Sequence, residues 1–155
     1  MGPLPDIDVV HLFEVPQHCA AVARLIHDEF WTTVPGASAQ AMQARLMQAA
    51  QADQVPLCLV ALHQGQPIGV VNLVDNDNDD HTDWWPWLAG MVVAAPWRGH
   101  GVGSALVLGL LEHARRLRIE RVYFGTDGPG FYTRLGAVQH LQLRADFWFM
   151  RFDLG

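Results

Sequence analysis

The glycine-rich turn Arg98-Gly-His-Gly-Val-Gly103 constrains the fold of this chain more than any other stretch. An apolar run at 88–93 precedes it, and an apolar run with helical spacing follows it. Glycines at 99, 101 and 103 let a ligand approach the backbone with no Cβ in the way. The N–H groups of 99–104 start a helix and lack intrahelical partners, and the helix dipole favours an anion there. This pattern predicts a strand, turn and helix that bind a pyrophosphate.

Three kinds of phosphate-binding turn compete for this pattern. A P-loop ends in Gly-Lys-Ser/Thr, but Gly103 is followed by Ser104-Ala105 without a lysine. A dinucleotide-binding turn, Gly-x-Gly-x-x-Gly, is nearly matched by 99–104, with Asp127 at about the right distance, but such a unit usually opens its domain. The third pattern, Arg/Gln-x-x-Gly-x-Gly/Ala after a strand, is matched in full by 98–103. A glycine turn without a ligand is the remaining alternative.

Composition narrows the class of protein. The 155 residues are enough for one domain, 1–155, with a sizeable core, and 50% hydrophobic with 17% charged residues indicates a globular chain. No apolar run is long enough to span a membrane, and no signal peptide is expected at the N-terminus. A net charge of −6 argues against a nucleic-acid partner and suits a cationic substrate. Cys19 and Cys58 are predicted to be buried thiols of a cytoplasmic protein.

The hydrophobic pattern predicts an order of strands and helices. Expected elements are a strand at 8–13, helices at 17–31 and from Ser38 to about 49, a hairpin of 57–63 with 68–74, a strand at 88–93, a helix to about 117, a strand at 120–126, a short helix ending at Gly136, and a hairpin of 137–143 with 147–153. Gly90 inside a strand indicates a bulge or a close backbone approach. The order predicts a single-domain α/β fold with a mixed sheet and helices on both sides.

A second motif, Phe131-Tyr132-x-x-Leu135-Gly136, follows the glycine turn. Together, in this order, the two motifs resemble those of the GCN5-related N-acetyltransferase (GNAT) superfamily, and the resemblance covers nearly the whole chain. It implies the acyl-CoA N-acyltransferase fold with a mostly antiparallel sheet. It also implies acetyl-CoA as cosubstrate, no metal, and transfer of the acetyl group to a primary amine by direct attack in a ternary complex. A non-catalytic acyl-CoA-binding module on the same fold is the alternative.

The resemblance assigns roles to named positions. The strand end would pair with the pantetheine arm, and the turn would bind the pyrophosphate. The predicted cofactor-binding residues are Met91, Val92, Val93, Arg98, Gly99, His100, Gly101, Val102, Gly103 and Ser104. Tyr132 would protonate the departing thiolate, the alternative being a core aromatic. The chain departs from the family pattern at three places. The proline of the strand exit, Pro96, comes one position later than usual, and Ala137 stands where an aromatic residue is usual. The strand at 87–93 lacks the carboxylate that many members have there.

Because the strand at 87–93 lacks a carboxylate, the identity of the general base stays open. An amine with a pKa of about 10.4 arrives charged, so a base must accept its proton. We assign this role to Asp75 in the acidic stretch 75–83, acting through water. The other candidate bases are Asp77, Asp83, His81, Asp28 and Glu29.

Tryptophans and aspartates together suggest an acceptor pocket, because indole faces and carboxylates both bind cations. The predicted acceptor residues are Trp31, Asp77, Asp83, Trp85 and Trp87. The tryptophans could equally be ordinary packing or a dimer contact. The acceptor is expected to be a small-molecule or peptide amine, with polyamine, aminoglycoside, amino acid and protein N-terminus all open. The chain is expected to be a monomer or a homodimer, with no membrane partner.

Overall fold

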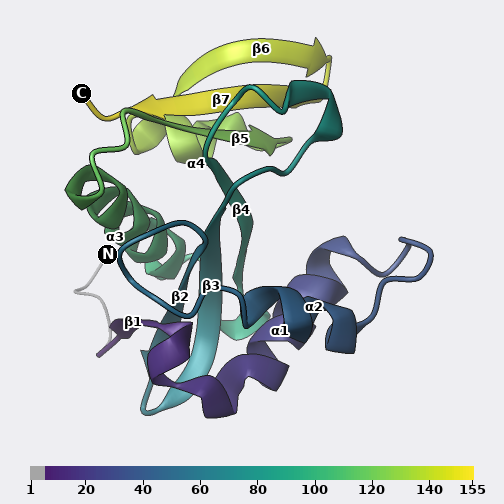
Figure 1. Ribbon diagram of the computed structural model, residues 1–155, viewed down its shortest axis with the longest axis vertical. Coiled ribbons are helices and arrows are strands. Elements are labelled where there is room, and N and C mark those ends of the chain that lie inside the picture. Colours follow the sequence, from purple (N-terminus) through teal and green to yellow (C-terminus); the bar gives the residue numbers. More distant parts are fainter. Residues whose placement is uncertain (1–5) are drawn as a thin grey trace.

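The computed structural model describes residues 6–155, which form a seven-stranded sheet in the order β1-β2-β3-β4-β5-β7-β6 (Figure 1). The strands are β1 (Asp8–His11), β2 (Leu57–His63), β3 (Gln66–Val74), β4 (Trp87–Val93), β5 (Arg121–Thr126), β6 (Val138–Arg144) and β7 (Phe147–Asp153). Within this part of the chain, neighbouring strands are antiparallel except for β4 and β5, which run parallel. The predicted mixed, mostly antiparallel sheet is confirmed. The start of the N-terminus, where no signal peptide is expected, lies outside the described residues.

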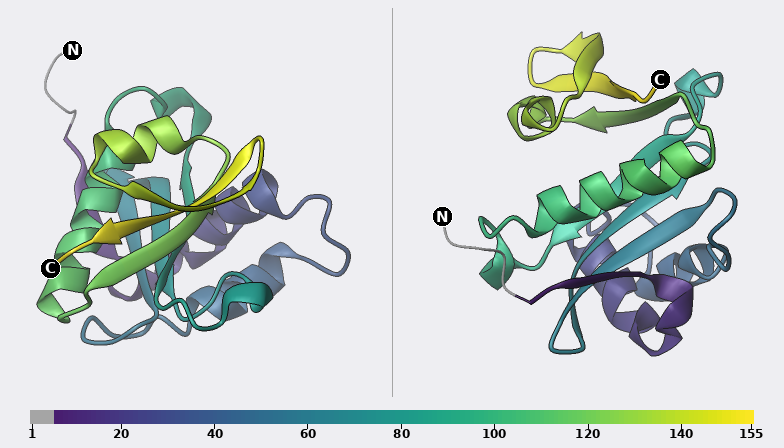
Figure 2. Two further views of the ribbon diagram at one scale, coloured as in Figure 1. Left: turned by 90° about the horizontal axis from the view of Figure 1, so that it is seen from above. Right: turned by 90° about the vertical axis from the view of Figure 1, so that its left-hand side faces the viewer.

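Helices cover both faces of the sheet, as predicted (Figure 2). They are α1 (Cys19–Phe30), α2 (Ala39–Leu46), α3 (Val102–Arg116) and α4 (Pro129–Arg134), with 3₁₀ turns η1 (Leu12–Glu14), η2 (Pro16–His18), η3 (Asp79–His81) and η4 (Ala95–Trp97). β2 is buried on both faces because Leu57 and Leu59 pack in the core cluster of α3, whereas Cys58 and Val60 pack in that of α1 and α2. No helix in the described part of the chain is both long enough and apolar enough to cross a bilayer.

The N-terminal elements follow their predicted pattern with two differences. The first strand ends at His11, because 12–14 turn into η1. In α1, Val22 and Ile26 are buried as expected, but Phe30 is 49% exposed, because it lies at the end of the helix, where the core no longer covers it. The predicted cap of α2 is confirmed, since Ser38 Oγ accepts a hydrogen bond from the Ala41 N–H at 3.0 Å.

Gly90 marks both a bulge and a close approach. β3 and β4 pair Val70 with Val92 and Asn72 with Ala89, so β4 contains one extra residue between these pairs. Gly90 has φ +57°, and a Cβ there would lie 3.0 Å from Asn72 Nδ2. A left-handed backbone against a buried amide requires glycine here.

The parallel strands β4 and β5 separate almost at once. In residues 6–155 they share one register pair, Trp87 with Tyr123, next to a hydrogen bond from the Tyr123 N–H to the Pro86 carbonyl at 2.9 Å. β5 then stays paired with β7 along its length, while β4 stays with β3. Figure 2 shows β5, β7, β6 and α4 as a part of the molecule that stands away from the end of β4. The β5-facing edge of 91–93 is therefore left without a strand partner.

β6 is the last strand of the sheet and is largely exposed (Figure 1). Its pairing with β7 shifts register twice, between Gln139 and Leu141 and between Gln142 and Arg144. Val138, Leu141 and Leu143 are 42–49% exposed.

Both cysteines are buried and free, as predicted. Burial raises the pKa of the Cys19 thiol and of the Cys58 thiol, so neither is an activated nucleophile.

Candidate active site

The separation of β4 and β5 opens a cavity of about 540 Å³, which we call the turn cavity. It is lined by Glu29, Met91, Val92, Val93, Trp97, Arg98, Gly99, Gly101, Val102, Gly103, Ser104, Phe131, Arg134 and Leu135. Of the positions predicted to bind the cofactor, the lining lacks His100, whose exposed ring lies edge-on to Trp97 at 6.2 Å.

Glycine is required at the positions of the turn for different physical reasons. Gly99 and Gly101 have φ +78° and +83°, a conformation that favours glycine, and Gly101 is the N-cap of α3. A Cβ on Gly103 would lie 3.2 Å from Phe131 Cζ, so this glycine lets α4 approach α3. Within residues 6–155 the N–H groups of 99–104 donate no hydrogen bond, and the first bond of the helix runs from Ala105 to Gly101. Six free donors at a helix N-terminus form an anion site.

Arg98 ties the turn to two other elements. Its Nε donates to the Val93 carbonyl at 2.9 Å, and its Nη2 lies 3.3 Å from Glu29 Oε2 at the end of α1. Glu29, one of the candidate bases, is therefore paired with a cation at the turn cavity. The guanidinium keeps further donors for an anion in the cavity.

Tyr132 lies on α4 beside the turn cavity but outside its lining, which includes the neighbouring Phe131. Its ring packs on Phe124, with centroids 4.4 Å apart, and on Phe131 at 4.9 Å. Burial, with a smaller contribution from the negative charge of Asp127, raises the pKa of Tyr132 to about 12. The phenol therefore stays protonated across the neutral range and can donate a proton.

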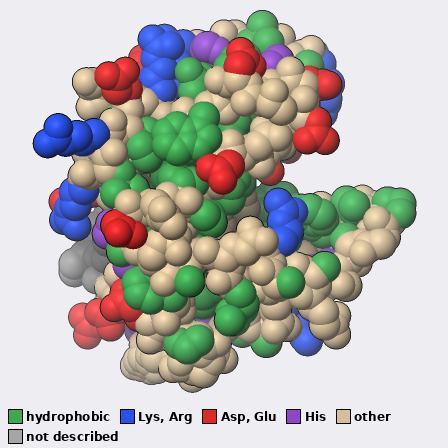
Figure 3. All heavy atoms as spheres, in the orientation of Figure 1, with side chains coloured by type: hydrophobic (Ala, Val, Ile, Leu, Met, Phe, Trp, Pro, Cys, Tyr) green, Lys and Arg blue, Asp and Glu red, His purple; other side chains and the backbone are tan. Residues whose placement is uncertain are grey.

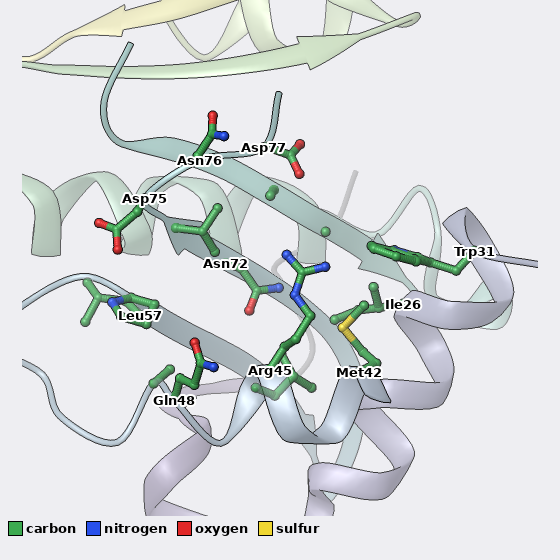
Figure 4. Close-up of a pocket in the computed structure, with 16 residues that line it drawn as sticks. Ile26, Trp31, Met42, Arg45, Gln48, Leu57, Asn72, Asp75, Asn76 and Asp77 are labelled. Atoms are coloured by element: carbon green, nitrogen blue, oxygen red, sulfur yellow. The ribbon is translucent and has the colours of Figure 1, made fainter. Parts of the chain in front are cut away.

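A second cavity of about 330 Å³, which we call the carboxylate cavity, lies between α1, α2 and the strands β3 and β4 (Figure 4). It is lined by Ile26, Trp31, Met42, Arg45, Leu46, Gln48, Ala49, Pro56, Leu57, Asn72, Val74, Asp75, Asn76, Asp77, Ala89 and Gly90. In Figure 3 the surface is hollowed between the α1–α2 part and the part that carries β5, β6 and β7. The carboxylate cavity reaches β4 at Ala89 and Gly90, and the turn cavity begins at Met91. Consecutive stretches of β4 therefore line the two cavities.

Two of the candidate bases line the carboxylate cavity. Asp75 accepts a hydrogen bond from Trp85 Nε1 at 2.8 Å. Asp77 is an exposed residue that lines the cavity. Partial desolvation by the surrounding protein raises the pKa of its carboxyl, and the nearby Arg45 partly offsets this effect. Asp83 and His81 lie outside the lining, and His81 instead stacks on Trp84 with centroids 3.8 Å apart.

The predicted tryptophans have three different environments. Trp31 lines the carboxylate cavity, with the Arg45 Cζ 5.2 Å from its ring centroid. Trp85 is exposed, and its Nε1 donates the hydrogen bond to Asp75. Trp87 does not lie in the predicted acceptor pocket: it is 1% exposed and packs against Trp84 and Tyr123. An indole in the middle of the sheet cannot also face a ligand.

Several lining residues were not predicted from the sequence, among them Arg45 and Asn72. Asn72 carried a signal, because it is the one amide inside the apolar run 68–74. Arg45 carried none, because a charged residue on a polar helix face is ordinarily solvated.

Comparison with known proteins identifies the family. Residues 23–137 match the model of the acetyltransferase (GNAT) family. The chain belongs to this family. A comparison with curated protein sequences gave no match.

Solved structures share the GNAT fold at low sequence identity. The yncA protein of Salmonella typhimurium, solved with its cofactor acetyl-CoA, is 18% identical with a TM-score of 0.73, over 97% of this chain and 95% of that one. YhbS of Escherichia coli, a GNAT family N-acetyltransferase in complex with CoA, is 20% identical with a TM-score of 0.70, over 100% and 85%. An aminoglycoside 6′-N-acetyltransferase complexed with coenzyme A is 14% identical with a TM-score of 0.74, over 96% and 97%.

The raised pKa of Asp77 predicts a stability effect in this GNAT chain. A carboxyl whose pKa is higher in the folded state favours folding when neutral, and this contribution is lost as the pH rises through the folded pKa. Asp77→Asn should therefore raise Tm slightly at pH 7 and change it less at acidic pH, in thermal melts across the pH range. Asp83→Asn, outside both cavities, serves as the matched control. A lower Tm for Asp77→Asn at pH 7 would show that the ionised carboxylate stabilises the fold.

Proposed function

We propose that this chain is an N-acetyltransferase that moves the acetyl group of acetyl-CoA to a primary amine by direct attack in a ternary complex. The observation that carries this proposal is that consecutive stretches of β4, on either side of the Gly90 bulge, line two cavities. One contains unpartnered N–H donors for an anion, and the other contains carboxylates for an amine. Membership of the acetyltransferase family and the CoA bound in related structures support the same assignment.

The residues of the turn cavity fit CoA. The free N–H groups of 99–104, with Arg98, would hold the pyrophosphate. The edge of 91–93, which has no strand partner on the β5 side, would pair with the amides of the pantetheine arm. CoA supplies the acetyl group as a thioester, and a backbone N–H near Val93 would polarise its carbonyl.

The reaction needs three proton transfers. The ammonium of the acceptor first loses a proton, through water, to a carboxylate of the carboxylate cavity. We favour Asp77 over Asp75, because desolvation makes Asp77 the stronger base and Asp75 already accepts the Trp85 hydrogen bond. The neutral nitrogen then attacks the thioester carbon, the C–S bond breaks, and the phenol of Tyr132 protonates the thiolate. The second amine proton returns through water to Tyr132, leaving an amide and the free thiol of CoA.

Turnover tests the proposal against the alternative of a non-catalytic acyl-CoA-binding module. Purified chain, acetyl-CoA and a panel of primary amines should release thiol, measured with a chromogenic thiol reagent. CoA binding without thiol release for any amine would favour the binding module. Thermal protection by CoA but not by NAD would exclude the dinucleotide-binding alternative.

Gly101→Ala should weaken CoA binding by roughly tenfold or more, because the backbone must leave φ +83° and the N–H donors turn away from the anion. Calorimetric titration with CoA measures this. Gly65→Ala is the matched control, because Gly65 has φ +77° with nothing near its Cβ position and lies in the β2–β3 turn. Unchanged CoA affinity in Gly101→Ala would show that the turn is not the pyrophosphate site.

Tyr132→Phe should lower kcat by roughly a hundredfold, the low end for a general acid, because the thiolate is already a fair leaving group. The Kd for CoA should change little. Since the pKa of Tyr132 is raised to about 12, the basic limb of the kcat profile should not come from this residue. Equal losses in kcat and CoA affinity would instead make Tyr132 a packing residue.

Asp77→Asn should lower kcat/KM at neutral pH and remove the acidic limb of its pH profile. In the wild type that limb should lie above the range of an ordinary aspartate, because the pKa of Asp77 is raised and the base works only when ionised. Steady-state rates across the pH range, with Asp83→Asn as control, measure this. If Asp75→Asn removes the limb and Asp77→Asn keeps it, the base is Asp75.

A further inference from the structure

The carboxylate cavity also contains a cation. Arg45 rises from α2 into the cavity, and its guanidinium lies between Asn72 and Trp31 (Figure 4). Among residues 6–155 it has no carboxylate oxygen within 4.0 Å and donates no hydrogen bond, while its Cζ sits 5.2 Å from the Trp31 ring centroid. The contact with the indole face leaves all five N–H donors of the guanidinium available. Such a group is suited to bidentate binding of a carboxylate.

Asn72 is a second polar group without a partner at this site. The residue is only 7% exposed, and within the described chain its side-chain amide makes no hydrogen bond. Its side chain lines the cavity beside Gly90. The polar atoms of this amide are not fully buried, since the fully buried side-chain polar atom without a partner in the described chain is His11 Nδ1. The amide of Asn72 is therefore open to a ligand in the cavity, to which it can donate and from which it can accept hydrogen bonds.

The charges of the cavity are separated. Asp77 is near enough to Arg45 for the cation to act on its carboxyl, yet the two do not form a salt bridge. Ile26, Met42 and Leu46 supply an apolar wall. The volume of about 330 Å³ is at the low end for ligand pockets, which indicates a small molecule.

We propose that the acceptor is a free α-amino acid with an apolar side chain, whose carboxylate binds Arg45 and whose ammonium faces Asp77. This inference rests on the proposed function and names its substrate class. Asn72 would hydrogen-bond the amino acid beside the Gly90 bulge, where its nitrogen meets the thioester. The apolar side chain would pack on Ile26, Met42 and Leu46.

The same charges disfavour other amines. A polyamine or an aminoglycoside carries several positive charges and would place one against Arg45 at close range, where like charges repel. A protein N-terminus offers a neutral carbonyl in place of the carboxylate, so the guanidinium would lose its charged partner. Arg45 therefore selects for a negative charge next to the reacting amine.

A series of three matched acceptors tests this selection. L-leucine, L-leucinamide and 3-methylbutylamine share one side chain and one primary amine but differ in the carboxylate. Leucine should have the highest kcat/KM, exceeding that of 3-methylbutylamine by roughly tenfold to a hundredfold, the range of a charge-assisted contact. An amide or amine that equals or exceeds leucine overturns the inference.

Arg45→Gln supplies the second arm, because it keeps a polar side chain with hydrogen-bonding capacity but removes the charge. The loss of kcat/KM with leucine should exceed the loss with 3-methylbutylamine by roughly tenfold. Arg115→Gln, an exposed arginine on α3 outside the cavities, is the control. CoA affinity and Tm should follow the wild type in both variants, which separates a substrate effect from misfolding. An unchanged preference for leucine in Arg45→Gln overturns the role of Arg45.

A binding measurement distinguishes failure of this inference from failure of the proposed function. Calorimetric titration of leucine into the CoA complex should give a Kd that Arg45→Gln raises. Turnover of amines without a carboxylate preference leaves the acetyltransferase assignment intact and overturns the amino-acid acceptor. Arg45-dependent binding of leucine without turnover of any amine leaves the binding site intact and overturns the enzyme.

Discussion

A single pair, Trp87 with Tyr123, joins the parallel strands in the described chain, and the rest of the site depends on how soon those strands part. Had the ladder continued, the edge of 91–93 would be paired and closed to a ligand. Because it stops, the turn cavity forms between the end of β4 and α4, and the N-terminus of α3 faces it. The buried indole of Trp87, which packs against Trp84 and Tyr123, lies at the point of separation.

The Gly90 bulge lies between the stretches of β4 that line the two cavities. An extra residue in β4 changes the direction of the strand, so that Ala89 and Gly90 face the α1–α2 side while 91–93 line the turn cavity. The close approach of Asn72 to Gly90 makes the bulge depend on a missing Cβ. One strand thus contributes to the lining of both cavities.

The local signals of the sequence were enough for most of the fold and for the glycine turn. The periodicity of β2, β3 and α3, and the turn with positive φ at Gly99 and Gly101, depend on neighbours in sequence. The acceptor side was harder to predict, because it forms from α1, α2, β3 and β4, which are far apart in the chain. Nothing local distinguishes Arg45 from a solvated helix residue, or Trp87 in the core from the exposed Trp85. Those distinctions depend on tertiary packing.

The other end of the sheet has a consequence for how copies of this chain meet. An open edge strand that carries exposed Val138, Leu141 and Leu143 would ordinarily be a template for adding strands from other molecules. In β6, however, two register shifts interrupt the regular spacing of backbone donors and acceptors, and the ribbon curls (Figure 1). A curled edge cannot match a straight partner strand over many residues. The irregular pairing of β6 thus acts against open-ended aggregation, even though its side chains are apolar.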